Sequence, residues 1–137
     1  MARKAKNKSH ELHNGRTKHL CAECPAKCCH KLLIPFSRPR NESDLDYYKW
    51  HLQYDTVSIA VRSHRWYVVV DGRCIYLDDD NLCTRYDDRP DTCRDHNPPD
   101  CEHYGEWYDL MFETPEALQE FWDKEKARKR RRRRRRK

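Results

Sequence analysis

The chain has 137 residues, 36% of them hydrophobic and 38% charged, so we expect one domain with a thin core of the kind that disulfides or metals commonly reinforce. The net charge of +6 is unevenly distributed along the chain. Residues 1–18 contain six basic residues and one acidic residue, and residues 124–137 contain twelve basic residues and one acidic residue, so the residues between them carry a net charge of −10. No apolar run approaches the ~20 residues that cross a bilayer, and residues 1–20 lack the apolar segment of a secretory signal, so the sequence excludes a transmembrane helix and predicts a cytoplasmic protein.

This charge distribution predicts three parts in the chain. Residues 1–18 show no periodicity and are expected to form a flexible basic arm. Residues 19–123 are expected to form a domain that contains every cysteine, and residues 124–137 an arginine-rich tail that continues from the last helix. The overall charge therefore describes neither the acidic body nor the basic arms.

The first half of the domain is predicted to hold two short helices. Proline suits the first position of a helix, so we expect a helix that begins at Pro25 and runs towards Ile34. Ser43 and Asp46 form a plausible capping box, which predicts a second helix over roughly residues 44–53. Leu45, Tyr48 and Leu52 fall on one face of that helix.

A β-hairpin is predicted next. The segments Thr56–Arg62 and Arg65–Asp71 are rich in β-branched and aromatic residues and are joined at Ser63-His64. The acidic run Asp78–Asp80 could hold a hard cation, but a solvated turn is the favoured interpretation.

Two further helical segments are predicted in the last third. Pro90 is expected to open a helical turn that holds Cys93, and the aromatic segment 101–113 to pack on the core. Thr114 and Pro115 predict the start of a last helix that ends near Lys129, since repulsion among the seven arginines that follow disfavours regular structure. The fold class predicted from these elements is α+β, a small metal-organised domain of short helices and one hairpin with flexible basic arms.

Eight cysteines in two blocks of four are the feature that most restricts the function. The first block has the spacing C-x-x-C-x-x-x-C-C, and the second is looser. A dense cysteine pattern in a reducing compartment is more often metal-binding than disulfide-bonded, and thiolates suit zinc, iron–sulfur clusters or copper(I). The predicted metal ligands are Cys21, Cys24, Cys28, Cys29, Cys74, Cys83, Cys93 and Cys101.

The spacing of the first block leaves the number of metal centres open. Cys21 and Cys24 can hold one ion from a single turn, with Cys28 in reach of the same centre. Adjacent residues on a helix point ~100° apart, so Cys28 and Cys29 are not expected to be equivalent ligands of one tetrahedral ion. Eight thiols could complete two four-cysteine sites, or one site with spare thiols. Three histidines beside cysteines are alternative ligands: His30, His96 and His103.

The second block contains a more specific pattern, Tyr86-Asp-Asp-Arg89-Pro90-Asp-Thr-Cys93-Arg94. Together with the first block, this Y-x-x-R-P-x-x-C-R segment resembles the YkgJ-type cysteine-cluster family of zinc- or iron-chelating domains, over roughly residues 20–101. The resemblance implies that the first seven cysteines are ligands or candidates, with Cys101 expected as the eighth. It leaves the cofactor open between zinc and iron, and the thiolate chemistry adds an iron–sulfur cluster as an option. Arg89 and Arg94 could neutralise such a centre or pair with neighbouring aspartates.

Three functions are compatible with this pattern. The favoured one is a non-catalytic metal-binding module. A related domain occurs in the flagellin lysine N-methylase, so the alternative is an iron–sulfur-dependent redox or protein-modifying enzyme or accessory factor. A metal chaperone or storage protein is the third. The three isolated glycines provide no phosphate-binding loop.

The basic tail is predicted to bind nucleic acid or another polyanion through phosphate contacts and counterion release, without reading sequence. The run lacks the aromatic interleaving that would stack single-stranded bases. A solubilising tail is the alternative. The predicted contact residues are Arg128, Lys129, Arg130, Arg131, Arg132, Arg133, Arg134, Arg135, Arg136 and Lys137.

Overall fold

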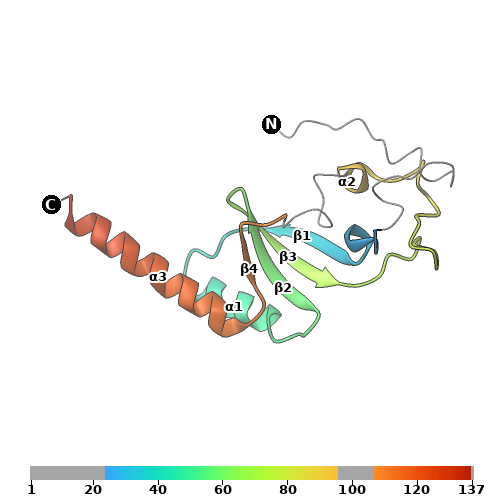
Figure 1. Ribbon diagram of the computed structural model, residues 1–137. Helices are drawn as coiled ribbons and strands as arrows, with labels where there is room; N and C mark the ends of the chain where they lie inside the picture. Colours follow the sequence, from blue (N-terminus) through green and yellow to red (C-terminus); the bar gives the residue numbers. More distant parts are fainter. Residues whose placement is uncertain (1–23, 96–106, 137) are drawn as a thin grey trace. The chain divides into compact units, whose positions relative to one another are not determined.

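The computed structural model describes residues 24–95 and 107–136, and the chain divides into two compact units (Figure 1). We name them the cysteine unit, which contains all eight cysteines, and the sheet unit. The cysteine unit comprises Met1–Leu32 and Asp71–Trp107, and the sheet unit comprises Leu33–Val70 and Tyr108–Lys137. The described residues form helices and one antiparallel sheet, so the predicted α+β class is confirmed. The predicted limits at residues 18 and 123 stay a prediction.

The predicted hairpin is confirmed and forms the centre of a four-stranded sheet. Strands β2 (Val57–Arg62) and β3 (Arg65–Asp71) pair antiparallel, with Val57 opposite Val70 and Arg62 opposite Arg65. Ser63 and His64 both have positive φ, 48° and 67°, which matches the twist of a two-residue hairpin turn. The strand order is β1-β3-β2-β4, so β1 and β4 are the edges.

The helix predicted from Pro25 towards Ile34 is wrong. A single 3₁₀ turn, η2 (Lys27–Cys29), is followed at once by strand β1 (Lys31–Phe36). Ala26 has φ 56° and ψ 45°, a left-handed conformation that an α-helix cannot contain. Pro35 is tolerated inside β1 because an edge strand leaves one side of its backbone unpaired.

Helix α1 (Glu42–His51) begins earlier than predicted, because its N-cap is Asn41 and not Ser43. The side-chain oxygen of Asn41 accepts a hydrogen bond from the backbone N–H of Asp44 at 2.8 Å. The Asp44 carboxylate in turn accepts from the backbone N–H of Arg40 at 2.9 Å. The N-cap therefore lies two residues before the predicted one, and the carboxylate at Asp44 accepts the N–H that precedes the cap residue instead of the N–H of the cap itself.

Helix α3 (Pro115–Arg134) begins as predicted, with the Thr114 hydroxyl accepting from the Ala117 N–H at 3.2 Å. It ends five residues later than the predicted Lys129, because helix propagation is much easier than nucleation and the packed first half supplies the nucleus. Glu125 also accepts hydrogen bonds from Arg38 at 3.2 Å and from Arg128 at 3.0 Å. Its negative charge offsets part of the repulsion among the arginines of α3. Of the helices in the described ranges, none has the length and apolar character that crossing a bilayer requires.

The hydrophobic core lies in the sheet unit, between the two long helices and the sheet (Figure 1). Its buried members are Leu45, Leu52, Ile59, Val61, Trp66, Phe112, Leu118 and Trp122. Phe112, in strand β4 (Leu110–Phe112), stacks on Trp66 with ring centroids 6.0 Å apart, so this end of the aromatic segment does pack on the core. Residues 101–106 of that segment lie outside the described residues. In the described part of the cysteine unit, by contrast, the buried hydrophobic residues are Ala26 and Leu77 alone.

We predict that Asn41→Ala destabilises the sheet unit by about 1 kcal/mol, the usual cost of losing an N-cap side chain. Ser43→Ala is the matched control and should change the free energy of unfolding by less than about 0.5 kcal/mol. Urea denaturation of both variants measures the difference. A larger loss for Ser43→Ala would place the cap where the sequence predicted it.

Candidate metal centre

A cavity of about 390 Å³ in the cysteine unit is lined by six of the eight predicted ligands. They are Cys24, Cys28, Cys29, Cys74, Cys83 and Cys93. Cys21 and Cys101 lie outside the described residues. Both cysteine blocks therefore contribute thiols to the same cavity, although they are far apart in the sequence. That these thiols bind metal stays a prediction.

The first block is shaped by the turn that precedes η2. The Cys29 N–H donates to the Ala26 carbonyl at 2.8 Å and the His30 N–H to the Lys27 carbonyl at 3.1 Å. The His30 ring also donates from Nδ1 to the Ala26 carbonyl at 2.9 Å, and His30 is not among the described residues that line the cavity. The other two candidate histidines, at positions 96 and 103, lie outside the described residues.

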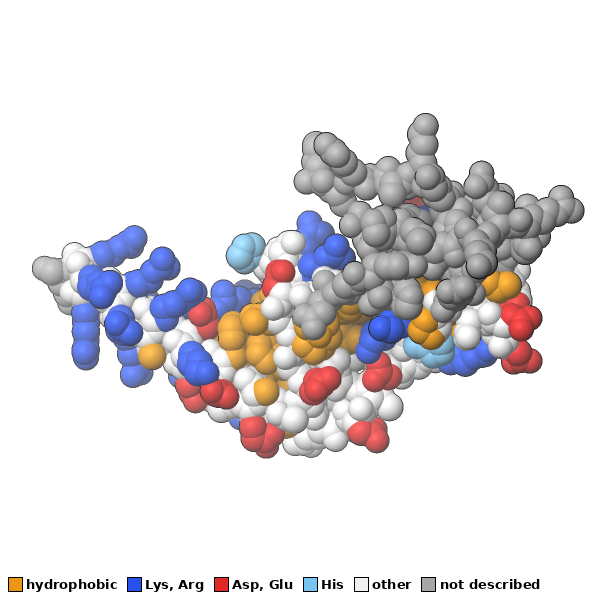
Figure 2. All heavy atoms as spheres, viewed as in Figure 1, with side chains coloured by type: hydrophobic (Ala, Val, Ile, Leu, Met, Phe, Trp, Pro, Cys, Tyr) orange, Lys and Arg blue, Asp and Glu red, His pale blue; other side chains and the backbone are white. Residues whose placement is uncertain are grey.

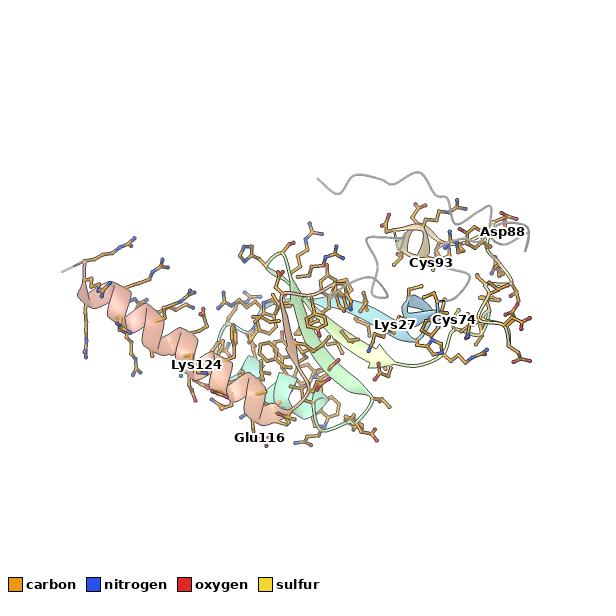
Figure 3. The ribbon with its side chains drawn as sticks, in the orientation of Figure 1. Lys27, Cys74, Asp88, Cys93, Glu116 and Lys124 are labelled. Atoms are coloured by element: carbon orange, nitrogen blue, oxygen red, sulfur yellow. The ribbon has the colours of Figure 1, made fainter. Side chains whose placement is uncertain are left out.

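Backbone hydrogen bonds bring Cys74 to the first block. The Cys74 N–H donates to the Cys29 carbonyl at 2.8 Å, and the Gly72 N–H donates to the His30 carbonyl at 2.9 Å. A salt bridge of 2.9 Å between Lys31 and Asp71 continues this pairing. Figure 3 shows the result, with Cys74 beside the turn that carries Lys27.

The acidic run forms the predicted turn and returns the chain to the cavity at Cys83. One carboxylate oxygen of Asp78 accepts from the N–H groups of Asp80 at 2.9 Å and Leu82 at 2.8 Å. An isolated antiparallel bridge then pairs Leu77 with Cys83. Because this carboxylate accepts two hydrogen bonds within its own turn, the structure favours the turn over a cation site.

The Y-x-x-R-P-x-x-C-R segment folds around its two arginines. Arg94 donates to two backbone carbonyls, those of Arg89 at 2.9 Å and Asp87 at 2.7 Å. Arg89 donates to the Tyr86 carbonyl at 3.1 Å and lies 3.9 Å above the centre of the Tyr86 ring. These contacts hold the loop from which helix α2 (Asp91–Arg94) presents Cys93, with the predicted proline immediately before it.

The thiols of the cavity influence each other electrostatically. A hydrogen bond with Cys28 lowers the pKa of Cys29 by stabilising its thiolate, while burial and the other nearby thiols oppose this change. Burial raises the pKa of Cys93, and the positive charge of Arg89 opposes that increase. This influence follows from the placement of thiols from both blocks around one cavity.

The cavity has the donor chemistry of a zinc or iron site but not the close spacing of an assembled one. Thiolates are the soft ligands that zinc and iron–sulfur clusters prefer. Within residues 24–95 and 107–136, however, no three His, Cys, Asp or Glu side chains lie close enough together to hold an ion. The six thiols surround the cavity without meeting at a point.

Two tyrosine–arginine pairs also line the cavity, and only one of them belongs to a motif that the sequence showed. Arg85 lies 4.8 Å above the Tyr76 ring and donates to the Tyr76 hydroxyl at 3.2 Å. All four residues of the two pairs line the cavity. The Y-x-x-R motif draws attention to Tyr86 and Arg89, whereas no local pattern marks Tyr76 and Arg85, which meet only because the acidic turn folds back.

Comparison with known proteins agrees with this chemistry. The chain matches the family described as "Putative zinc- or iron-chelating domain" over residues 20–130, and it belongs to this family. The predicted resemblance is thereby confirmed. Searches of curated proteins and of solved structures each found no match.

The first block departs by one residue from the spacing in the family's name, CxxCxxCC. Here three residues, Pro25-Ala26-Lys27, separate Cys24 from Cys28. Ala26, the middle one, takes the left-handed conformation and is buried at 7% exposure. The longer spacing is therefore accommodated by a tight turn at one small residue.

We predict that Arg94→Lys lowers the metal affinity of the protein about tenfold, the lower end of the effect of removing groups that support metal ligands. Lysine keeps the charge but cannot donate to two carbonyls in the fixed geometry of a guanidinium. Competition with a chromophoric chelator measures the affinity. Unchanged affinity would show that Arg94 contributes charge alone and does not position Cys93.

Proposed function

We propose that this chain is a non-catalytic metal-binding protein that holds zinc or iron through the cysteines of the cavity. One observation carries the proposal: six thiols from both cysteine blocks line one cavity. The family to which the chain belongs supports metal binding and leaves the choice between zinc and iron open. Cys21 and Cys101 complete the proposed set of eight ligands.

The composition of the cysteine unit supports a structural role for the metal. Among the described residues of the cysteine unit, the buried hydrophobic residues are Ala26 and Leu77. The burial of apolar surface therefore contributes little to the stability of this unit. Structural zinc sites contribute ~10–16 kcal/mol of apparent binding free energy, which is also folding free energy. Metal binding would draw the separated thiols together and so order the loops that carry them.

The cavity volume favours a second candidate function, iron–sulfur-dependent redox or protein-modifying activity. A volume of about 390 Å³ lies in the range of small-molecule sites. An iron–sulfur cluster, when bound, would supply electron transfer at a potential set by the hydrogen bonds and charges around it. Arg85 and Arg89, which line the cavity, are the residues whose charge would act on such a centre.

We include in the proposed function the binding of a polyanion by the arginine-rich end of α3. All residues from Lys126 to Arg136 are exposed, and the second half of α3 extends beyond the sheet and α1 (Figures 1 and 2). In the described chain, the last buried side chain of this helix is Trp122. A helix that projects in this way can contact phosphates along its whole exposed length.

Elemental analysis and the absorption spectrum of the anaerobically purified protein test the metal. An iron–sulfur protein should be brown with absorbance near 400 nm, whereas a zinc protein should be colourless. Cys83→Ser should lower the metal-to-protein ratio, and Asp79→Asn, in the neighbouring exposed turn, is the control that should retain it. A folded protein that binds neither metal would overturn the proposal.

Removal of the metal should affect the two units differently. We expect amides of residues 27–32 and 71–95 to exchange with solvent at rates approaching those of an unfolded chain, because the loops lose their common centre. Amides of β2 and of α1 should keep their protection, because the hydrophobic core does not involve the metal. Hydrogen exchange of the holo and apo proteins measures both. Equal loss of protection in the two units would contradict a separate core.

A further inference from the structure

We propose that the sheet unit binds single-stranded nucleic acid, with bases stacking on an aromatic face of α1 and phosphates contacting the arginine-rich end of α3. This inference rests on the polyanion binding proposed above and names the class of polyanion. It starts from a set of rings that the hydrophobic core does not use.

The aromatic face of α1 consists of Tyr47, Trp50 and Tyr54, whose side chains are exposed by 58%, 48% and 53%, respectively. Tyr47 and Trp50 belong to the helix, and Tyr54 follows its last residue by three positions. Tyr47 and Trp50 are stacked, with centroids 5.8 Å apart and planes inclined by 25°, and Tyr54 meets the Trp50 ring edge-on at 5.8 Å. Leu45 and Leu52 of the same segment are buried in the core. Three adjacent rings are thus held against each other in solvent, the arrangement on which bases stack.

Contacts between α1 and α3 fix where the basic segment begins relative to α1. The Glu42 carboxylate accepts from the Trp122 indole N–H at 3.1 Å and forms a salt bridge with Lys126. At the other end of α1, Lys49 donates to Gln119 at 3.0 Å. The two helices therefore run antiparallel, and the basic segment begins beside the first turn of α1.

The arginines supply positive charge on every side of α3. Arg130–Arg134 are consecutive residues of the helix, and successive residues point ~100° apart, so these five cover more than one full turn. Because the arginines point in all directions around the helix axis, some of them face the side of the unit on which the exposed rings lie. Along α3, the segment from Gln119, which contacts Lys49 of α1, to Arg134 spans about 22 Å, a length that suits the ~4–16 nucleotides typical of single-strand sites.

Acidic residues of α1 each have a partner, which reduces their repulsion of phosphate. Glu42 pairs with Lys126, and Asp46 lies 3.6 Å from Lys49. Asp44 accepts the backbone N–H of Arg40.

Exposed aromatic rings beside a cationic helix favour a single strand over a duplex or a lipid surface. Every base has a face that stacks on an aromatic ring, but the bases of a duplex are already stacked on each other. A duplex would contact the arginines and leave the rings without a partner, so the contribution of the rings distinguishes a single strand from a duplex. A membrane surface binds helices that have an apolar face, which the consecutive arginines of α3 do not provide.

Fluorescence anisotropy of the full-length metal-loaded protein tests the proposal, with a labelled RNA of about 12 nucleotides and a duplex of the same sequence. Tyr47→Ala combined with Trp50→Ala should weaken single-strand binding about tenfold or more and leave duplex binding nearly unchanged. Trp50→Tyr should retain most of the affinity. Ile34→Ala, which removes an exposed apolar side chain on β1, is the control for a loss of surface area.

A second variant separates this inference from the proposed function. Arg132→Gln, Arg133→Gln and Arg134→Gln together should weaken both ligands and reduce the salt dependence of binding. Arg62→Gln with Arg65→Gln, exposed arginines of the hairpin, is the matched control.

Equal losses of single-strand and duplex binding in the ring variant would overturn the inference but leave polyanion binding intact. Tighter binding to vesicles of anionic phospholipid than to the RNA would likewise overturn it. No effect of the three α3 substitutions on any ligand would overturn polyanion binding itself. Circular dichroism and metal content establish that each variant is folded.

Discussion

Burial of aromatic and aliphatic side chains between the two long helices and the sheet is the interaction on which the rest of the sheet unit depends. Leu45 and Leu118 are almost completely buried, and Trp66 and Phe112 stack beneath them in the sheet. This packing fixes α1 against α3, and it nucleates the helix whose second half has no core contacts of its own. The positions of the exposed rings and the arginines thus depend on the packing of these buried residues.

The cysteine unit is organised by a different kind of interaction. Its described loops are held by backbone hydrogen bonds, such as that from Cys74 to Cys29, and by the guanidinium of Arg94 on two carbonyls. These contacts aim thiols into a common cavity without supplying an apolar core. A unit built in this way gains most from a ligand that bonds to several loops at once, which is what a metal does.

Local sequence patterns predicted several of the parts of the fold that local interactions determine, although the N-cap of α1 was placed two residues too late. The hairpin at Ser63-His64 and the start of α3 at Thr114 depend on neighbouring residues, and both were predicted. Strand β1 was not, because a short apolar run such as residues 32–34 is compatible with helix or strand, and pairing with β3 decides between them. For the site, the cysteines and the Tyr86–Arg94 motif were visible in the sequence, whereas the pairing of Tyr76 with Arg85 depends on the path of the intervening turn.

The two edges of the sheet have a consequence for the behaviour of the protein at high concentration. Pro35 in edge strand β1 has no N–H to offer a partner, and the opposite edge, β4, is only three residues long. Open edges are the places where sheets from separate molecules join and aggregate. Both edges are therefore poor templates for the addition of a strand from another molecule.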